Sequence, residues 1–327
     1  MPKRCRHRHS LRLRPAIAQS SLLCAIPLRH TNMASITRRD LVSISTAAVL
    51  SHWTLPALRP TLPKRRGFLK AVKIDMVQQG ASLAEKFKIL RDCGFDGVEL
   101  DSPSSLQRDE VLAAKAQSGL QIPGVVDSEH WSKPFSDQDP AVRAAGREAL
   151  TIALHDAKTF GCTSVLVVPA VVTKTVTYED AWQRSQAELK SLLPLAAELQ
   201  IQLLIENVWN KFLLGPTELA RYVDELHSEW VGVHFDAGNL VTFGFPEHWV
   251  PILGHRIQKV DVKDFKRGRA DSKGFDVKLN EGDSDWPSIV AALKKIGYQG
   301  WFTAEMQGGN AAYLKDLGQR MDSFLKA

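Results

Sequence analysis

From about residue 71, short apolar runs alternate with longer amphipathic segments. The apolar runs are rich in Val, Ile and Leu, which is typical of parallel strands buried on both faces. They predict eight strands, at residues 72–77, 97–101, 122–126, 164–168, 202–206, 231–236, 257–262 and 301–305. The segments between and after them predict eight helices, at residues 82–93, 108–118, 140–160, 178–199, 217–226, 246–253, 286–296 and 311–326.

The ends of the predicted helices carry local signals. Ser82 and Asp139 are suited to cap helix starts, and Gly94 and Gly297 end helices just before a strand. Eight strand–helix units within residues 70–327 predict a single (β/α)8 TIM barrel, an α/β fold that typically needs ~250 residues. A doubly wound open sheet is the alternative. It would normally carry a Gly-rich turn after its first strand, and residues 78–82 contain a single Gly.

Four successive predicted strands carry a carboxylate at or beside their C-terminal end. These acids are Glu206, Asp236, Asp261 and Glu305. In a parallel barrel these strand ends meet at one mouth, where such barrels place their chemistry. One such acid could simply cap a helix or pair with an Arg. Four in consecutive strands repel one another unless a cation lies among them, so they predict a divalent-metal site that also transfers protons.

The charge is unevenly distributed along the chain. Residues 1–70 contain 14 Lys and Arg and one acid, whereas the remainder contains 28 basic and 35 acidic residues. The net charge of +6 therefore belongs to the leader, and the globular part gives no compositional indication of a nucleic-acid partner. We predict three parts: a basic leader at 1–32, disordered or untranslated; a signal and linker at 33–69; and the barrel at 70–327.

The segment from Met33 has the layout of an export signal. Arg38 and Arg39 precede an apolar stretch at residues 41–50 that is too short and too polar to span a bilayer stably. This layout predicts a twin-arginine signal with cleavage near Ala57, and hence an exported or periplasmic protein. A transit peptide or a plain disordered tail is the alternative, and with such a tail the protein would be cytoplasmic.

The two cysteines of the predicted barrel are Cys93 and Cys162, each beside a Gly just before a strand. Such turns lie far from the strand ends that carry the acids, so both are predicted to be structural thiols rather than catalytic ones. A disulfide between them stays open from the sequence.

Four stretches in the second half, LLIENVWN, VGVHFDAGN, VDVKDF and FTAEM, resemble the fifth to eighth strands of the xylose-isomerase-like TIM barrels, the sugar phosphate isomerase/epimerase family. This family includes ketose 3-epimerases of the D-tagatose type, hydroxypyruvate isomerases and proteins labelled hexulose-6-phosphate isomerase. The resemblance covers about residues 70–327, including GFDGVELDSP near the second strand. No single motif is specific; their order and spacing are.

The resemblance implies a metal held by Glu206, Asp236, Asp261 and Glu305. The family usually has His at the third position, where this chain has Asp261. An all-oxygen set favours Mn²⁺ or Mg²⁺ over Zn²⁺, although a site weakened at Asp261 is the alternative. The resemblance also assigns proton transfer to Glu206 and Glu305. It implies a sugar isomerase or epimerase that works through an enediolate of a ketose, aldose or related hydroxycarbonyl.

Five further residues are candidates for contact with a small-molecule sugar. Asn239 and Arg267 match positions that contact substrate in the family, the first being His in the epimerases. Lys263 is predicted to point inward beside the acids, and His130 and Trp131 follow the third strand, where Trp could stack on a sugar face. Each of the five could instead pack a loop or form a structural salt bridge.

Rival functions remain open at this point. One is a lyase or hydrolase acting on 3-keto-sugar derivatives, and another is a non-catalytic carbohydrate-binding barrel. A DNA-repair endonuclease of the same superfamily is disfavoured, because strands two, three and seven lack the His residues of a multi-zinc site. Nothing indicates a nicotinamide, flavin or nucleotide site, a nucleic-acid partner or a stable membrane span, and a homo-oligomer is not excluded.

Overall fold

The computed structural model describes residues 67–327, and these form a closed barrel of eight parallel strands in the order β1 to β8. The predicted (β/α)8 barrel is therefore confirmed and the open sheet is excluded. The predicted twin-arginine signal and the segment 1–32 lie outside the described residues and stay predictions. Within residues 67–327, no helix has both the length and the apolar character needed to cross a membrane.

The elements follow one another in strict alternation. The strands are β1 (Leu69–Lys73), β2 (Gly97–Ser102), β3 (Gly124–Asp127), β4 (Ser164–Val167), β5 (Gln202–Glu206), β6 (Val231–Asp236), β7 (Ile257–Val262) and β8 (Trp301–Ala304). The helices are α1 (Leu83–Asp92), α2 (Arg108–Ser118), α3 (Pro140–Phe160), α4 (Tyr178–Leu199), α5 (Pro216–Asp224), α6 (Pro246–Leu253), α7 (Trp286–Lys295) and α8 (Ala311–Leu325).

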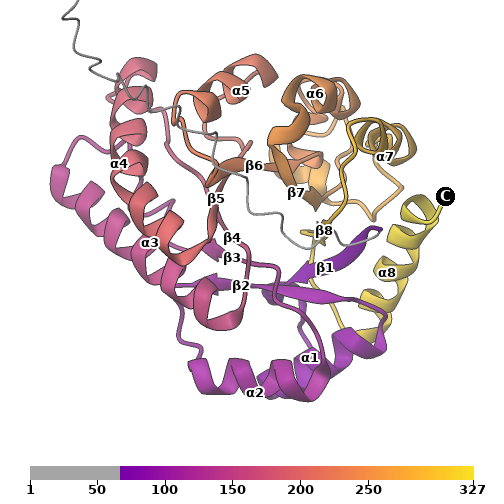
Figure 1. The fold of residues 1–327 in the computed structure, drawn as a ribbon. Helices are drawn as coiled ribbons and strands as arrows, with labels where there is room; N and C mark the ends of the chain where they lie inside the picture. The colour runs from indigo at the N-terminus through magenta and orange to yellow at the C-terminus, as the bar shows by residue number, and fades with distance from the viewer. Residues whose placement is uncertain (1–66) are drawn as a thin grey trace, which may run out of the picture. The chain divides into compact units, whose positions relative to one another are not determined.

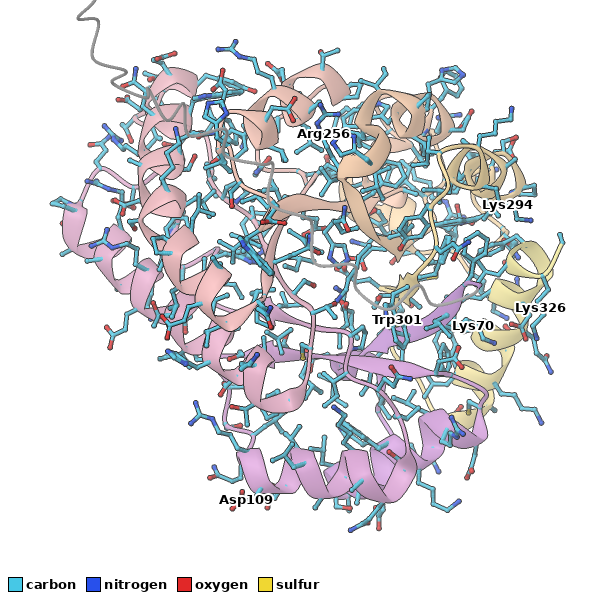
Figure 2. All side chains as sticks on the ribbon, viewed as in Figure 1. Lys70, Asp109, Arg256, Lys294, Trp301 and Lys326 are labelled. Atoms are coloured by element: carbon cyan, nitrogen blue, oxygen red, sulfur yellow. The ribbon has the colours of Figure 1, made fainter. Side chains whose placement is uncertain are left out.

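The helices form a ring around the strands (Figure 1). The apolar core fills the space between the two layers, because each helix turns one apolar face inward. The rings of Trp286 of α7 and Phe324 of α8, for example, stack at a centroid distance of 4.9 Å. Charged side chains such as Asp109 project outward from the ring (Figure 2).

The first strand lies earlier in the chain than predicted. The sequence favours a strand at residues 72–77, whereas β1 ends at Lys73 and Ile74–Met76 forms a 3-10 helix. Ile74 and Met76 are buried in this turn, so their apolar pattern could not distinguish it from a strand. The true strand begins at Leu69 and includes Lys70, a charge that lies before the predicted strand and finds its acid, Asp322 of α8, only in the closed barrel.

The third strand also lies later than predicted. Residues 122–126 were expected to form it, but β3 begins at Gly124 and ends at Asp127. Pro123 has no N–H to donate to a neighbouring strand, which excludes it from the ladder. The shift places a further carboxylate, that of Asp127, at the end of a strand.

The predicted helix ends are largely confirmed. The side chains of Ser82 and Asp139 accept hydrogen bonds from backbone N–H groups in the first turns of α1 and α3.

Cys93 and Cys162 are both free, so no disulfide joins them. Burial raises the pKa of the Cys162 thiol to about 12, which suits a structural residue.

Candidate metal and proton-transfer site

The ends of β5 to β8 bring the four predicted acids together. Glu206, Asp236, Asp261 and Glu305 each offer a carboxylate oxygen, and these oxygens all lie within 4.8 Å of one another. The strand register accounts for this arrangement, because Asp236 pairs with Asp261 across β6 and β7, while Asp261 pairs with Thr303 of β8. Side chains that alternate between the faces of each strand then turn these acids inward, toward the mouth.

Lys263 provides the nearest positive charge to three of the four acids, Glu206, Asp236 and Glu305, which are called the upper acids below. Its Nζ lies 3.0 Å from Asp236 Oδ2 and 3.1 Å from Glu305 Oε1. Among the described residues, this ion pair is the only polar contact of Asp236 Oδ2, a fully buried atom that accepts no hydrogen bond. One ammonium thus faces three carboxylates, which leaves the group with a net charge of about −2 when all three are ionised.

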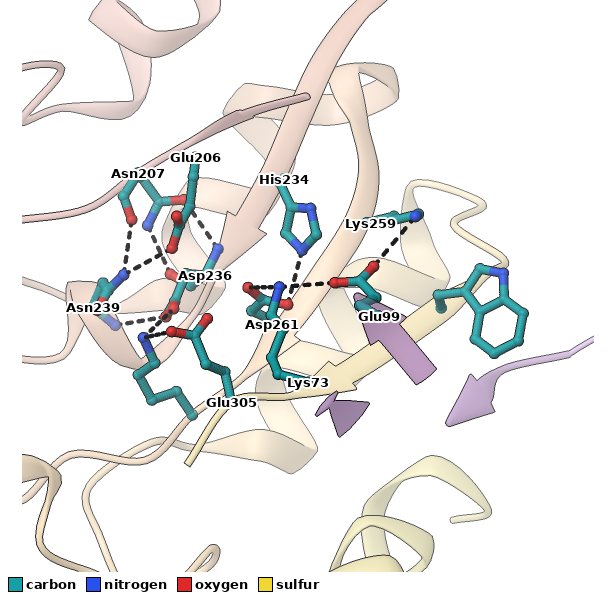
Figure 3. A network of polar contacts seen from close by, with 12 residues as sticks. Lys73, Glu99, Glu206, Asn207, His234, Asp236, Asn239, Lys259, Asp261 and Glu305 are labelled. Carbon is teal, nitrogen blue, oxygen red and sulfur yellow. Dashed lines mark hydrogen bonds and ion pairs between the residues drawn. The ribbon is translucent and has the colours of Figure 1, made fainter. Parts of the chain in front are cut away.

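A second charged layer lies deeper in the barrel, with Asp261 between the two layers (Figure 3). Lys73 Nζ lies 2.8 Å from Glu99 Oε2 and 3.2 Å from Asp261 Oδ2, and Lys259 Nζ lies 3.3 Å from Glu99 Oε1. His234 Nε2 and Asp261 Oδ1 share a hydrogen bond of 2.8 Å. Two lysines balance two carboxylates, so this layer needs no metal ion to be neutral.

Two asparagines hold the upper acids in place (Figure 3). Asn207 Nδ2 donates to the Asp236 carbonyl at 2.7 Å, and Asn207 Oδ1 accepts from the Asp236 N–H at 3.1 Å. The Asn239 N–H donates to Asp236 Oδ1 at 2.8 Å, and Asn239 Nδ2 lies 3.3 Å from Glu206 Oε1. Asn239, predicted to contact substrate, is buried and supports the acids instead of lining the cavity described below.

The acids differ in their readiness to ionise. Burial, with repulsion from Glu305 and Asp236, holds the pKa of Glu206 well above its usual range. Burial also raises the pKa of Asp236 to about 6, an effect that Lys263 opposes. Burial opposes ionisation of Asp261 as well, but His234 and Lys73 hold its pKa well below the usual value. Asp261 is therefore the stably charged member of the set.

This donor set fits a divalent cation. Four carboxylates converge, and two of their oxygens, Asp236 Oδ2 and Asp261 Oδ2, accept no hydrogen bond from the described residues. Burial, and then repulsion from Glu305 and Asp236, disfavour the ionised form of Glu206, which added positive charge would favour. Oxygen donors match Mn²⁺ or Mg²⁺. Both oxygens of Asp261 already contact His234 or Lys73, so Asp261 would share its charge with any ion.

A cavity of about 520 Å³ lies directly over the acids. Five of the predicted site residues line it: Glu206, Glu305, Lys263, His130 and Trp131. A sugar-sized molecule in this cavity would touch both candidate proton-transfer groups. A larger cavity, of about 1000 Å³, lies at the opposite end of the barrel beside the start of β5 and contains none of the four acids.

Arg267 is a predicted site residue whose contacts lie in the loop after β6. Its guanidinium donates to the carbonyls of Val241 and Gly244, at 2.7 Å each, and lies over the ring of Phe245. It does not line the 520 Å³ cavity, so substrate contact by Arg267 stays a prediction that would require a movement of its loop.

The sequence interpretation missed several charged residues at the site. Lys73 and Asp127 line the cavity, and Lys259 lies buried beneath it. A signal for Lys259 exists, since a Lys inside the apolar run of β7 must find a buried acid. The partner itself, Glu99, is 160 residues away and could not be read from the pattern.

Known proteins resemble this chain in sequence and in fold. The model of the xylose isomerase-like TIM barrel matches residues 87–325. The SgbU protein of Escherichia coli (strain K12), provisionally named an L-ribulose-5-phosphate 3-epimerase, is 29% identical over 239 residues, which cover 69% of this chain and 84% of that one.

Two solved structures show the same fold at low identity. A D-tagatose 3-epimerase-like protein matches with a TM-score of 0.69 at 19% identity, covering 79% of this chain and 97% of that one. The 3-keto-D-glucoside 4-epimerase YcjR of E. coli matches with a TM-score of 0.68 at 16% identity, covering 80% and 100%. With more than half of its length matched by the family model, the chain belongs to the xylose isomerase-like TIM barrel family.

Proposed function

We propose that the protein is a sugar isomerase or epimerase that depends on a divalent metal ion and moves protons with two carboxyl groups. The observation that carries the proposal is the convergence of four strand-end carboxylates beneath a cavity of about 520 Å³. Such a cavity has room for one small polyhydroxy compound over the acids. The relatives support the reaction class, since the SgbU protein carries the name of a 3-epimerase.

In this proposal Glu206, Asp236, Asp261 and Glu305 hold the ion, with Mn²⁺ or Mg²⁺ favoured by their oxygen donors. When bound, the ion would polarise a substrate carbonyl and its neighbouring hydroxyl, and so acidify the C–H between them. Lys263, which lies between Asp236 and Glu305, adds a second positive charge beside the position of a developing enediolate.

We assign the proton transfers to Glu206 and Glu305, because both line the cavity. One carboxylate removes a proton from the carbon next to the carbonyl, and the other carboxyl group returns a proton to a carbon of the enediolate. The raised pKa of Glu206, caused by burial and then by Glu305 and Asp236, suits a group that must hold a proton during the reaction. The Glu305 side chain is 38% exposed, so solvent water can reach it.

The proposal is tested by solvent-deuterium incorporation. Purified protein with Mn²⁺ or Mg²⁺ is incubated in D₂O with free ketoses, ketose phosphates and 3-keto-glycosides, with EDTA as the control. We expect deuterium at a carbon next to the carbonyl of at least one compound, and loss of exchange with EDTA. Recovery of a rearranged sugar would identify an isomerase or epimerase, whereas an elimination or cleavage product from a 3-keto-glycoside would identify a lyase or hydrolase.

Metal analysis of the same preparation supplies the second half of the test. A stoichiometric divalent ion that is lost together with exchange in Glu206→Gln supports the proposal. Protein that binds a sugar but no metal, and exchanges no proton, would instead be a carbohydrate-binding barrel.

A further inference from the structure

The loop after β7 is folded around the side-chain carboxylate of Asp264. Asp264 is buried, and its carboxylate accepts four backbone hydrogen bonds: from Phe265 at 2.8 Å, Asn280 at 2.9 Å, and Gly282 and Ser284 at 3.1 Å each. A Cβ at Gly282 would lie 2.0 Å from Asp264 Oδ1, so the backbone closes tightly on this carboxylate. TIM barrels frequently bind a substrate phosphate with N–H groups of the loops after strands seven and eight. Here four such N–H groups are already satisfied by Asp264.

The start of α8, the other common phosphate position, is also occupied by protein groups. The Ala311 N–H donates to Gln79 Oε1 at 3.0 Å, and the Tyr313 N–H donates to Asn310 Oδ1 at 3.1 Å. A phosphate here would have to displace both side-chain acceptors before it could use the positive end of the helix.

The cations near the cavity are committed as well. Lys73 and Lys263 line it, but each ammonium contacts two carboxylates within 3.2 Å. The Arg267 guanidinium donates to two backbone carbonyls outside the lining. Among the lining residues that the structure describes, no Arg or Lys is left to pair with a phosphate dianion.

The opposite side of the cavity is acidic. It carries three aspartates at or just after the ends of β1, β2 and β3, namely Asp75, Asp101 and Asp127. None of the three forms an ion pair with a described Lys or Arg. Burial, and then Asp75, raise the pKa of Asp101, an effect that Lys73 opposes. Burial raises the pKa of the Asp127 carboxyl to about 7, so it can donate a hydrogen bond at neutral pH.

One buried polar atom in the same region points to a ligand with hydroxyl groups. The His130 side chain is 93% buried and lines the cavity, and its Nδ1 has no hydrogen-bond partner among the described residues. Trp131, half exposed, lies edge-on to it with ring centroids 5.4 Å apart. Burial lowers the pKa of His130 to about 4, so it is a neutral group that can accept or donate one hydrogen bond but cannot offset a phosphate charge.

Building on the proposed function, we infer that the substrate is an unphosphorylated ketose, or another uncharged polyhydroxy carbonyl compound. Its hydroxyl-bearing end lies against Asp101, Asp127 and His130. An uncharged polyol can use carboxyl and imidazole groups as hydrogen-bond partners, whereas a phosphate would face three aspartates without a free cation. The chain thereby differs from what the name of the SgbU protein states for that relative, a 5-phosphate.

The test compares matched pairs of compounds on metal-loaded protein. Rates of solvent-deuterium incorporation are measured for L-ribulose and L-ribulose 5-phosphate, and for other free ketoses and their terminal phosphate esters. We expect kcat/KM for a free ketose to exceed that of its phosphate on the order of a hundredfold, because juxtaposed like charges strongly disfavour the wrong ligand. Exchange into a phosphate ester at an equal or higher rate would overturn this inference and leave the proposed function standing.

Two variants locate the discrimination. Asp127→Asn should raise KM for the free ketose about tenfold with kcat within about threefold, since it alters a hydrogen bond away from the reacting carbons. Asp101→Lys should lower the ratio of kcat/KM for the free ketose to kcat/KM for the phosphate ester at least about tenfold, because it places a cation on the acidic side of the cavity. Exposed Asp109→Asn serves as the matched control. It should have the parental KM and kcat for the free ketose and the parental preference over the phosphate ester. An unchanged preference in a folded Asp101→Lys protein would contradict the assignment of this side of the cavity.

A binding measurement separates the two hypotheses. Calorimetric titration with inorganic phosphate and with a free pentitol needs no turnover. Binding of the pentitol, and of phosphate only in Asp101→Lys, supports the inference even if no compound is turned over, in which case the proposed function alone fails. Phosphate binding to the parent protein that competes with the pentitol would overturn the inference.

Discussion

His234 and Asp261 share a buried hydrogen bond of 2.8 Å between Nε2 and Oδ1, and this bond ties the two charged layers of the barrel together. The other Asp261 oxygen lies 3.2 Å from Lys73 Nζ. Asp261 is thus held in place by its own neighbours before any ion binds. Asp236, by contrast, has among the described residues a single cation beside it, Lys263 at 3.0 Å, and shares that ammonium with Glu305. The two aspartates are therefore unequal candidates for metal ligation, although both belong to the acid cluster.

This inequality predicts different losses of metal affinity. Asp236→Asn should weaken Mn²⁺ binding more than about a hundredfold, whereas Asp261→Asn should weaken it about tenfold, the size expected when a shared or supporting partner is altered. Calorimetric titration of EDTA-treated protein measures both values, with Asp109→Asn as the control. Equal losses in the two variants would show that Asp261 is a full ligand despite His234 and Lys73.

Neutralising either candidate proton-transfer residue should stop exchange. Glu206→Gln and Glu305→Gln keep the side-chain shape and remove the group that accepts the proton, so each should lower kcat/KM at least about a hundredfold. Solvent-deuterium incorporation into the preferred ketose measures the loss, and circular dichroism checks the fold. Exposed Glu110→Gln should retain the parental rate. Full activity in Glu305→Gln would require another base in the cavity.

Removal of the Lys263 ammonium should have opposite effects on metal binding and on metal-free stability. Lys263→Met leaves the carboxylates of Glu206, Asp236 and Glu305 without their nearest cation, so Mn²⁺ affinity should rise about tenfold. The EDTA-treated variant should lose about 3 kcal/mol of unfolding free energy, because a buried charge has lost its partner. Titration calorimetry and urea unfolding provide the two values, with exposed Lys278→Met as the control. A lower Mn²⁺ affinity would mean that Lys263 helps to bind the ion instead of competing with it.

The close approach of the segments that follow β6 and β7 predicts a sensitive glycine, Gly238. A Cβ at Gly238 would lie 2.6 Å from Lys263 Cβ and 2.8 Å from the Lys263 carbonyl group, contacts that only a backbone shift can relieve. Gly238→Ala should cost about 1–3 kcal/mol and weaken metal binding, because it moves Lys263 relative to Asp236. Gly244→Ala is the matched control in the same loop, since its Cβ would meet nothing closer than 4.0 Å. Thermal unfolding with and without Mn²⁺ measures both effects.

Asp127 predicts a defined pH dependence of stability. Its pKa is raised by burial to about 7 in the fold, against about 3.9 in an unfolded chain. Between these values the folded protein holds a proton that the unfolded chain has released, so the contribution is complete below about pH 4 and is lost as the pH rises through 7. The stability of the parent relative to Asp127→Asn should therefore fall by up to about 4 kcal/mol between pH 4 and pH 8.

Urea unfolding of the two proteins across this range provides the measurement. Burial lowers the pKa of His130 to about 4, so His130 gives a slope of the opposite sign in the same window. That slope is present in both proteins and cancels in the difference. A difference independent of pH would show that Asp127 is ionised in the folded protein at all these values.

Much of the architecture could be predicted because its causes are local. Runs of Val, Ile and Leu must be buried, Gly and capping residues end helices, and eight such units leave few alternatives to a closed barrel. The positions of Glu206, Asp236, Asp261 and Glu305 follow from the same reasoning, since parallel strands bring their C-terminal ends together. The start of β1 could not be located in this way, because Lys70 is charged and its partner, Asp322, lies in α8.

By itself, the sequence determined the barrel, the number of its units and the four acids at its mouth, because periodicity and strand ends are properties of neighbouring residues. The tertiary structure alone decided how each charge is compensated. Lys259 meets Glu99 across 160 residues, Lys263 lies between Asp236 and Glu305, and Asp264 fills its own loop. A buried charge takes the partner that barrel closure places beside it, and that proximity arises only once all eight strands have paired.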